Sequence, residues 1–401
     1  MLRRLLPALC ACVLLLGAAE GVKATPAGPD LARAYNGFGL RLFAQLRGQD
    51  DRQNLFMSPA SVALALAIVA NGGAGTTRES ILDVLGAKNA PIAGFNASNQ
   101  ALMSALTQTG GDLQFTIANA LWINDREKLL PSFVSTSRDV FKAEAQALPF
   151  GDPSAAKTIN DWVDTHTNGR IPEIVDQTNS QDLVVVTNAI AMKAKWLVEF
   201  EKAATHDAPF ETASGAPMTV SMMSRDGTFG YADAQGWQVA RLPYRGDRFA
   251  MYVLLPHKGV ALHDALKSFD DAAFDRAIGE LKPQEIAFSM PRFTATYKAE
   301  LNAALIQLGM GDAFEASTAN FSNLVPPPQA AWINLVVHRA FVRVDEEGTE
   351  AAAATAVAIR TLAIRMPPEI KMIVDRPFLM AIRDDKTKQL LFVGAIYKPE
   401  K

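Results

Sequence analysis

The sequence predicts an α+β fold, because helical patterns dominate its first half and strand patterns its second. Apolar side chains recur at helical spacing from Leu31 to Leu46, and Asp30 is placed as the N-cap of that helix. Residues 61–70 are apolar nearly all round, which predicts a buried helix. The later run from Phe249 to Pro256 is continuous, apolar and without a helical period. With 401 residues, 49% of them hydrophobic, the chain can bury a large core.

Two further helices are predicted from capping signals and periodicity. Thr76 and Glu79 have the spacing of a capping box ahead of an apolar stretch. A later amphipathic face runs from Ile159 to His166 and ends at Asn168-Gly169, a typical helix stop. Long apolar runs rich in β-branched residues predict strands at 183–192, 249–256, 333–344, 378–382 and 389–397. No Gly/Ser-rich or charged linker divides the chain, so residues 25–401 are predicted to form one domain.

Residues 1–24 have the pattern of a cleaved secretory signal. Two arginines near the start precede an apolar stretch, Leu5 to Leu16, that is short for a bilayer-spanning helix. Small residues follow, and cleavage after Ala19 or after Ala24 fits equally well. The alternatives are an uncleaved anchor or a buried helix. We therefore expect a secreted protein, extracellular or periplasmic.

Both cysteines, Cys10 and Cys12, lie inside this leader. The mature chain would have no thiol and hence no disulfide and no cysteine-based metal or catalytic site. Lipid modification at Cys12 is a weaker alternative, because much of the apolar stretch follows it. The net charge is −3 and no block of like charges occurs, so no nucleic-acid or membrane partner is expected.

The motifs of common enzymes are absent. The sequence contains no H-E-x-x-H, no G-x-S-x-G, no phosphate-binding G-x-x-x-x-G-K and no G-x-G-x-x-G. Its five histidines are dispersed and none lies at metal-ligand spacing from another ligand. We expect no metal, no cofactor and no catalytic activity.

The stretch EEGTEAAAATAVAI at residues 346–359 is the most informative segment. Composition alone favours a surface helix, because alanine has the highest helix propensity. As a strand, however, the segment has two distinct faces. One face, from Thr349 through Ala351 to Ile359, is small or aliphatic and uncharged, whereas the other begins with Glu350 and ends with Arg360. Such a strand could bury its uncharged face, and the alanines at 351–354 place only small side chains near its start.

Around this segment the sequence resembles the serpins, the serine protease inhibitor superfamily, over roughly residues 30–400. The resemblance is to a bacterial-type, secreted and inhibitory member. It rests on ordered motifs: NLFMSPASVALALAIVANG (54–72), IANALWINDREKLLPSF (117–133), INDWVDTHTNGRI (159–171), LVVVTNAIAMKAKW (183–196), LPYRGDRFAMYVLLP (242–256), VVHRAFVRVDEEGTEAAAATAV (336–357) and DRPFLMAIRDDKTKQLLFVGAIYKP (375–399).

The resemblance implies three β-sheets, about nine helices and an exposed reactive-centre loop, here about residues 346–368. It implies a monomeric inhibitor that uses no cofactor. A serine protease cleaves the loop and becomes acyl-linked to it. The protease is then trapped when the loop inserts as a strand of the central sheet, a strand addition that releases stored strain. Cysteine proteases are further partners that the resemblance admits.

The same resemblance assigns residues 346–354 to the loop hinge. Serpins that lack inhibition tend to have bulky, charged or proline residues there. This hinge has the residues that permit insertion, with Glu350 on the face that would stay outside and no proline between 346 and 366. The hinge residues are Glu346, Gly348, Thr349, Glu350, Ala351, Ala352, Ala353 and Ala354.

Family spacing from the hinge glycine places the reactive bond between Leu362 and Ala363. Leucine suits the apolar pocket of chymotrypsin-like proteases, and also of elastase-like ones. Counting back from Pro367-Pro368 gives Ile364 instead. Arg360 or Arg365 would suit a trypsin-like pocket, in which a buried aspartate binds the cation.

Further positions are carried over as parts that control opening of the sheet. Ser58, Ser61, Asn188 and His338 match a polar cluster beneath its centre. Trp196 matches the tryptophan where the loop first enters, and Glu346 matches a hinge glutamate paired with a base, here Arg292. Ala194 departs from the family's usual glycine, which leaves the local backbone geometry open. The competing hypotheses are a non-inhibitory serpin, acting as carrier, chaperone or substrate, and a secreted hydrolase.

Overall fold

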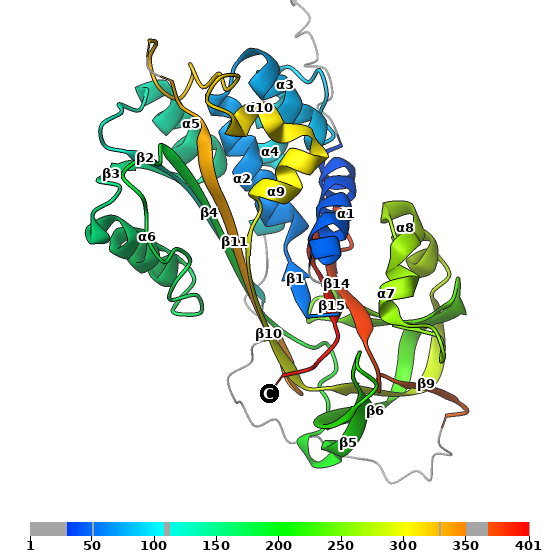
Figure 1. Ribbon diagram of the computed structural model, residues 1–401. Helices are drawn as coiled ribbons and strands as arrows, with labels where there is room; N and C mark the ends of the chain where they lie inside the picture. Colours follow the sequence, from blue (N-terminus) through cyan, green and yellow to red (C-terminus); the bar gives the residue numbers. More distant parts are fainter. Residues whose placement is uncertain (1–29, 50–51, 108–112, 329, 350–367, 401) are drawn as a thin grey trace, which may run out of the picture.

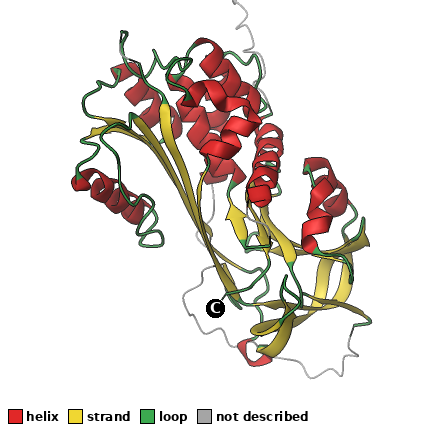
Figure 2. Cartoon of the chain, in the orientation of Figure 1, coloured by secondary structure: helices red, strands yellow, loops and turns green. Residues whose placement is uncertain are grey.

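The computed structural model describes residues 30–49, 52–107, 113–328, 330–349 and 368–400. Helices gather at one end of the molecule and most strands of the larger sheet at the other (Figure 2). A long six-stranded sheet connects the two ends (Figure 1). Helix α6 lies on one face of this sheet, and the group that contains α2 lies on the other. The α+β prediction is confirmed.

The predicted early helices are present and about nine helical bodies are found in the described residues. α9 and α10 form one continuous body through a π-helical turn that kinks at Gly309. The helices are α1 (Leu31–Gln49), α2 (Pro59–Gly72), α3 (Gly75–Val84), α4 (Ile92–Thr107), α5 (Pro131–Phe141), α6 (Pro153–His166), α7 (Leu262–Ala265), α8 (Asp271–Gly279), α9 (Asn302–Leu305) and α10 (Gly311–Phe314).

One prediction about a helix start is wrong. Thr76 and Glu79 do not form a capping box, because α3 begins at Gly75 and its N-cap is Ala74, which has no side-chain cap. The Ala74 backbone N–H instead donates to the Asn320 carbonyl, 2.8 Å away. A tertiary contact from a distant segment replaces the local cap, which the sequence pattern alone does not reveal.

The six-stranded sheet has the order β10-β11-β12-β4-β2-β3. Two of its long strands, β4 and β11, are parallel and pair directly from Val184 and Ile333 up to Ala191 and Phe341. Its strands are β2 (Leu113–Asn124), β3 (Glu144–Leu148), β4 (Val184–Lys195), β10 (Phe293–Glu300), β11 (Ile333–Val344) and β12 (Gly348–Thr349).

The nine-stranded sheet has the order β1-β15-β14-β8-β7-β6-β9-β13, with β5 added on β6. β6 is shared by two groups of strands, because residues 217–222 pair with β5 and residues 230–234 pair with β7. Three strand groups are therefore distinguished within two hydrogen-bonded sheets. The strands are β1 (Leu55–Met57), β5 (His206–Glu211), β6 (Pro217–Ala234), β7 (Trp237–Pro243), β8 (Phe249–Pro256), β9 (Lys282–Pro291), β13 (Ile370–Ile373), β14 (Phe378–Asp384) and β15 (Leu390–Ile396).

Two buried apolar clusters hold the layers together. The larger contains residues of both sheets, for example Met192 of β4 and Val253 of β8, together with nearly all of α2. The smaller joins α6, through Ile159 and Val163, to the opposite face of the six-stranded sheet. Since side chains alternate along a strand, β4 and β11 supply both clusters with alternate residues.

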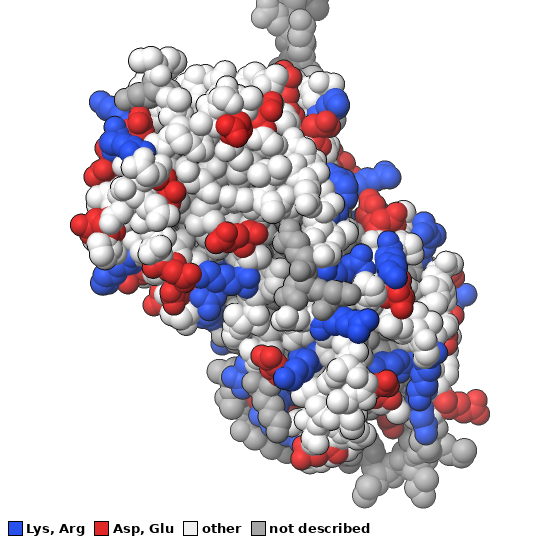
Figure 3. Space-filling view, in the orientation of Figure 1, with Lys and Arg blue, Asp and Glu red and all other residues white. Residues whose placement is uncertain are grey.

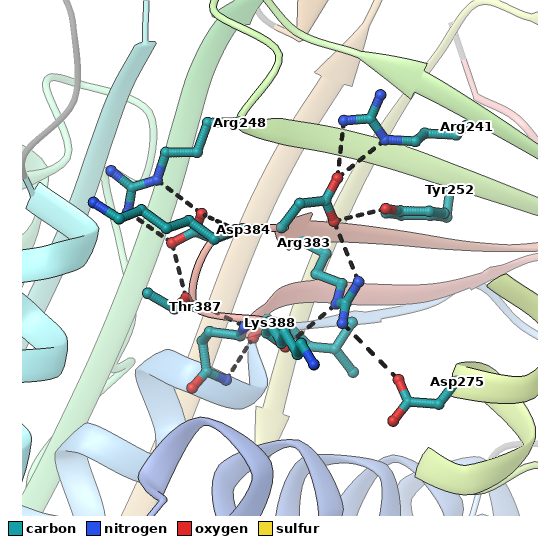
Figure 4. A network of polar contacts seen from close by, with 12 residues as sticks. Arg241, Arg248, Tyr252, Asp275, Arg383, Asp384, Thr387 and Lys388 are labelled. Atoms are coloured by element: carbon teal, nitrogen blue, oxygen red, sulfur yellow. Dashed lines mark hydrogen bonds and ion pairs between the residues drawn. The ribbon is translucent and has the colours of Figure 1, made fainter. Parts of the chain in front are cut away.

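The C-terminal hairpin β14–β15 lies within the larger sheet, between β8 and the edge strand β1. An ionic network fixes its turn (Figure 4). The fully buried carboxylate of Asp384 accepts from Arg248 Nη2 at 2.7 Å, while Asp385 accepts from Arg241 and from the hydroxyl of Tyr252. Removing the Arg248 cation alone would leave a buried charge unpaired.

Charges on the surface are mixed. On the face shown in Figure 3, both signs interleave over the lower half, and the upper half over the helices is mostly uncharged. Among the described residues, no helix is both long and apolar enough to cross a membrane. In the same residues no group of three or more His, Cys, Asp or Glu side chains is arranged to hold a metal ion.

Candidate functional site: the hinge between β4 and β11

The chain reverses at the end of β11 and re-enters the sheet. A tight turn links Asp345 and Gly348, whose backbone groups exchange hydrogen bonds at 2.9 and 3.3 Å. Gly348 and Thr349 form β12, antiparallel to both neighbours: Thr349 pairs with Ala194 of β4 and with Val344 of β11. The beginning of the predicted hinge is thus already a strand between β4 and β11.

Glycine is required at position 348 by the close approach of β4. A Cβ built on Gly348 would lie 2.8 Å from Lys195 Cα and closer still to the Ala194 carbonyl oxygen. Both contacts are with backbone, which cannot move aside easily. Ala194, which replaces the family's usual glycine, sits in regular strand geometry with its methyl group buried.

Two stacked aromatic side chains pack against the start of the hinge on its core-facing side. Trp196 and Tyr244 are buried and stacked with ring centroids 4.6 Å apart. The Trp196 indole N–H donates to the Asp345 carbonyl at 2.9 Å. The hydroxyl of Thr349 lies 2.6 Å from that of Tyr244. The Thr349 side chain therefore faces the larger core, as the alternation of the segment predicts.

Three consecutive carboxylates, Asp345, Glu346 and Glu347, lie in the turn between β11 and β12, and all are largely buried. Asp345 accepts from the backbone N–H groups of Glu347 and Gly348, and burial raises its pKa. Glu346 accepts from the Thr205 hydroxyl at 2.8 Å.

Each glutamate of this group also lies near a cation. Arg292 Nη1 is 3.7 Å from Glu346 Oε2, so the structure brings the predicted pair together at long range. Lys202 Nζ is 2.6 Å from Glu347 Oε1, and this hydrogen bond raises the pKa of Lys202. The turn before the hinge is held by ionic contacts from the residue that follows β9 and from the segment that follows β4.

The predicted polar cluster lies farther from the hinge, where β4 and β11 still pair directly. Ser58, the N-cap of α2, accepts from the Ser61 N–H at 3.2 Å. Asn188 Nδ2 donates to Ser61 Oγ at 2.5 Å and also to Asn119 of β2. His338 of β11 is hydrogen-bonded to Asn188 Oδ1 at 2.5 Å. All four predicted residues are brought together and are fully buried.

The contacts fix the tautomer of His338. Its Nε2 accepts from the Ser58 backbone N–H at 3.3 Å, so Nδ1 carries the proton and donates to Asn188. Burial lowers the pKa of His338 to about 3, and the side chain is neutral at physiological pH. The bond between His338 and Asn188 joins β11 to β4 directly.

Several predicted site residues lie outside the described residues. These are the later hinge residues Glu350, Ala351, Ala352, Ala353 and Ala354, and the reactive-bond candidates Leu362, Ala363, Ile364, Arg360 and Arg365. The same holds for the predicted signal segment, 1–24.

Sequence reasoning missed four residues of the site: Asn119, Tyr244, Lys202 and Thr205. Asn119 carried a signal, as a polar residue inside the apolar run IANALWI. The other three did not, because their contacts follow from how the segments after β7 and after β4 approach the hinge.

Comparison with known proteins shows the family. The profile of the serpin family (serine protease inhibitor) matches residues 33–399. The chain belongs to the serpin family.

Relatives and solved structures agree with this assignment. The human leukocyte elastase inhibitor is 32% identical, with 92% of this chain and 100% of that protein covered. The thermophilic serpin tengpin in its native state superposes with a TM-score of 0.84 at 30% identity, covering 92% of this chain and 94% of tengpin. Human thyroxine-binding globulin, in complex with thyroxine, superposes with a TM-score of 0.85 over 93% of this chain and 100% of that one. At 23% identity it shows the fold alone.

His338 is expected to make the stability of the protein depend on pH, because the unfolded chain binds a proton at this side chain more readily than the folded protein does. The imidazole of His338 takes up a proton below about pH 6.5 in the unfolded chain, but only near pH 3 in the folded protein. The contribution of neutral His338 to the free energy of unfolding is therefore complete above pH 6.5 and is lost as the pH falls toward 3. Between pH 7.5 and 5.5 we expect His338 to lower the free energy of unfolding by an amount on the order of 1 kcal/mol.

The measurement is denaturant unfolding at several pH values for the native protein and for His338→Asn. The variant should show a shallower pH dependence between 7.5 and 5.5, whatever its stability at neutral pH. His206→Asn, at an exposed position, is the matched control and should keep the native slope. Equal slopes in the protein and in His338→Asn would show that the cluster is not the pH-sensitive element.

Proposed function

We propose that this serpin is a secreted, single-use inhibitor of serine proteases. A protease would cleave the loop between Leu362 and Ala363 and remain acyl-linked to the new C-terminus. The freed segment would then insert fully between β4 and β11 and carry the protease away from its docking position. The observation that carries the proposal is the hinge, whose first strand residues already pair with both of these neighbours.

The pairing register supports full insertion. Continuing β12 in its present register places residues 350–359 opposite residues 193 down to 184 of β4. In that register Ala351 would face Met192 and Val342, both buried in the larger core. The inward positions of the segment are the small and aliphatic ones, so the inserted strand would bury no charge on that side.

The target class follows from the proposed reactive bond. Leu362 suits chymotrypsin-like and elastase-like pockets, and the similarity to the leukocyte elastase inhibitor favours the same class. Trypsin-like proteases, through Arg360 or Arg365, are the alternative targets. A carrier function remains the second candidate, since thyroxine-binding globulin has the same fold. The small, proline-free hinge favours inhibition over this alternative.

Incubation with chymotrypsin, with neutrophil elastase and with trypsin is the first test. We expect a complex that survives denaturing electrophoresis with chymotrypsin or elastase, together with a released C-terminal peptide that starts at Ala363. A peptide starting at Thr361 or Met366 from trypsin would move the bond and keep the mechanism. Clean cleavage by all three proteases without a stable complex would contradict inhibition.

Two adjacent substitutions test insertion itself. Ala351→Glu would force a carboxylate into the core between Met192 and Val342, so cleavage should outrun insertion and the stable complex should be lost. Ala352→Glu makes the same chemical change on the outward face, beside the half-buried Phe341, and should leave most complex formation intact. Gel quantification of complex against cleaved inhibitor measures the difference. Equal behaviour of the two variants would contradict strand insertion with this alternation.

Secretion is proposed from the leader alone. Expression of the full chain in a secreting bacterial host should give a mature protein that begins after Ala19 or Ala24, outside the cytoplasm. N-terminal sequencing distinguishes the two sites. Retention of Met1 on a cytoplasmic product would contradict the proposal.

A further inference from the structure

A surface cavity lies against the segment that follows β4, residues 197–205. Its volume is about 480 Å³. It is formed by Val198, Glu199, Glu201 and Ala204 of this segment and by residues 224–226 of β6. The cavity is separate from the hydrogen-bonded cluster at the centre of the sheet and from the ionic network of the C-terminal hairpin, since it shares no residue with either.

Other residues of the same segment hold the turn between β11 and β12. The backbone N–H of Phe200 donates to the Glu346 carbonyl at 2.8 Å. Thr205 donates to the carboxylate of Glu346, and Lys202 Nζ lies 2.6 Å from Glu347 Oε1. The segment therefore connects the cavity to the turn that precedes the hinge strand.

Arg225 is a half-buried cation that forms no ion pair within the described ranges. Its Nη1 donates to the Val198 carbonyl at 3.1 Å, and its guanidinium lies over the Phe229 ring, 4.3 Å from the ring centroid. Its Nε–H is buried and has no hydrogen-bond acceptor among the described residues. Burial lowers the pKa of Arg225 to about 10, and no neighbouring carboxylate opposes that shift. The guanidinium thus retains the capacity to bind a carboxylate.

The carboxylates around the cavity restrict which ligand can reach this cation. Glu201 and Asp226 are exposed, and Glu199 accepts from Arg245 Nη2 at 3.0 Å. These carboxylates would repel a polyanion or a phosphate, whereas Arg225 would repel a simple cation. The lining therefore favours a small molecule that carries one negative and one positive charge.

We propose that this cavity binds a small zwitterion with an apolar side chain, of the chemical class of the free amino acids. The ligand carboxylate pairs with Arg225, and its ammonium group pairs with Asp226 and Glu201. Val198, whose exposed fraction is 55%, and the exposed Ala204 contact the apolar side chain. The proposal is independent of the proposed inhibitory function, because it concerns a ligand and not a protease.

The bound ligand also stabilises the turn between β11 and β12. A ligand that contacts both Arg225 of β6 and the segment 197–205 favours the present position of that segment. This is the position in which Phe200, Lys202 and Thr205 reach the turn. The cavity is therefore an effector site for the turn, and by linkage a loosened turn would weaken the binding of the ligand.

Ligand-observed NMR with leucine as the probe tests the site. We expect a dissociation constant on the order of 1 mM, as for a good ligand of this small size. Two analogues of leucine, 4-methylpentanoate without the ammonium group and 3-methylbutylamine without the carboxylate, should each bind about tenfold more weakly. Inorganic phosphate should not compete with leucine. No detectable binding of leucine at about 10 mM, or equal binding of the three organic probes, would refute the site.

Substitutions at the two charged sides of the cavity give opposite expectations. Arg225→Gln should weaken leucine binding about tenfold, and Arg225→Lys should weaken it less. Asp226→Asn should weaken the binding of leucine and strengthen that of 4-methylpentanoate, a pair of changes that a folding defect does not produce. Arg276→Gln removes an exposed cation of α8 outside this cavity and should bind leucine as the native protein does. Unchanged leucine affinity in Arg225→Gln would overturn the proposal, and circular dichroism verifies that each variant is folded.

Hydrogen exchange followed by mass spectrometry tests the effect on the turn in the native protein. With leucine at about ten times its dissociation constant, peptides that cover 197–205 and 345–349 should exchange about three- to tenfold more slowly. Peptides from α6 should exchange as before. Protection of 197–205 without protection of 345–349 would refute the effect on the turn and support the binding site alone. A protein that traps no protease would leave these expectations unchanged, so the two proposals fail separately.

Discussion

The direct parallel pairing of β4 with β11 is the constraint on which the rest of this molecule depends. A strand placed between two parallel neighbours can run antiparallel to both of them. The chain leaves β11 through a four-residue turn and returns in that direction, so β12 is correctly oriented from its first residue. Insertion would replace one parallel ladder by two antiparallel ones, and antiparallel pairing is slightly more stable per residue. The direction of β12 is therefore the one in which insertion would add antiparallel ladders on both sides.

Two different kinds of contact hold the closed form. At the hinge, ionic and aromatic contacts fix the turn, with Trp196 bonded to the Asp345 carbonyl and Lys202 to Glu347. At the centre of the sheet, a neutral and fully buried hydrogen-bond network joins His338 to Asn188. In the first set, the exposed Lys202 side chain makes its ion pair with Glu347 sensitive to salt, whereas the second set is fully buried and uncharged. The turn from Asp345 to Gly348 is thus positioned while β4 and β11 remain paired with each other along the rest of their length.

Much of the fold was predictable because its signals are local. The buried helix at 61–70 and the strands at 249–256 and 333–344 follow from continuous apolar runs, and their observed bounds agree closely. The start of α3 was not predictable, since Ala74 is held by a carbonyl from residue 320. Nor were the partners of the hinge carboxylates, because Lys202 and Thr205 belong to a short 3-10 turn after β4 whose approach to the hinge no local pattern reveals. The resemblance to serpins assigned the hinge, while only the register shows which strands its first residues join.

The polar character of the buried cluster has a physical reason within this register. Continuing β12 would bring Thr355 opposite both Asn188 and His338. The inserted strand would have to separate their hydrogen bond and leave a buried donor, Nδ1–H, and a buried acceptor, Oδ1. A threonine hydroxyl can accept from the first and donate to the second, whereas an aliphatic side chain there would leave both unpaired at considerable cost. The residues that close the sheet and the residue that would arrive between them are thus chemically matched, which lets the same polar groups be satisfied in both forms.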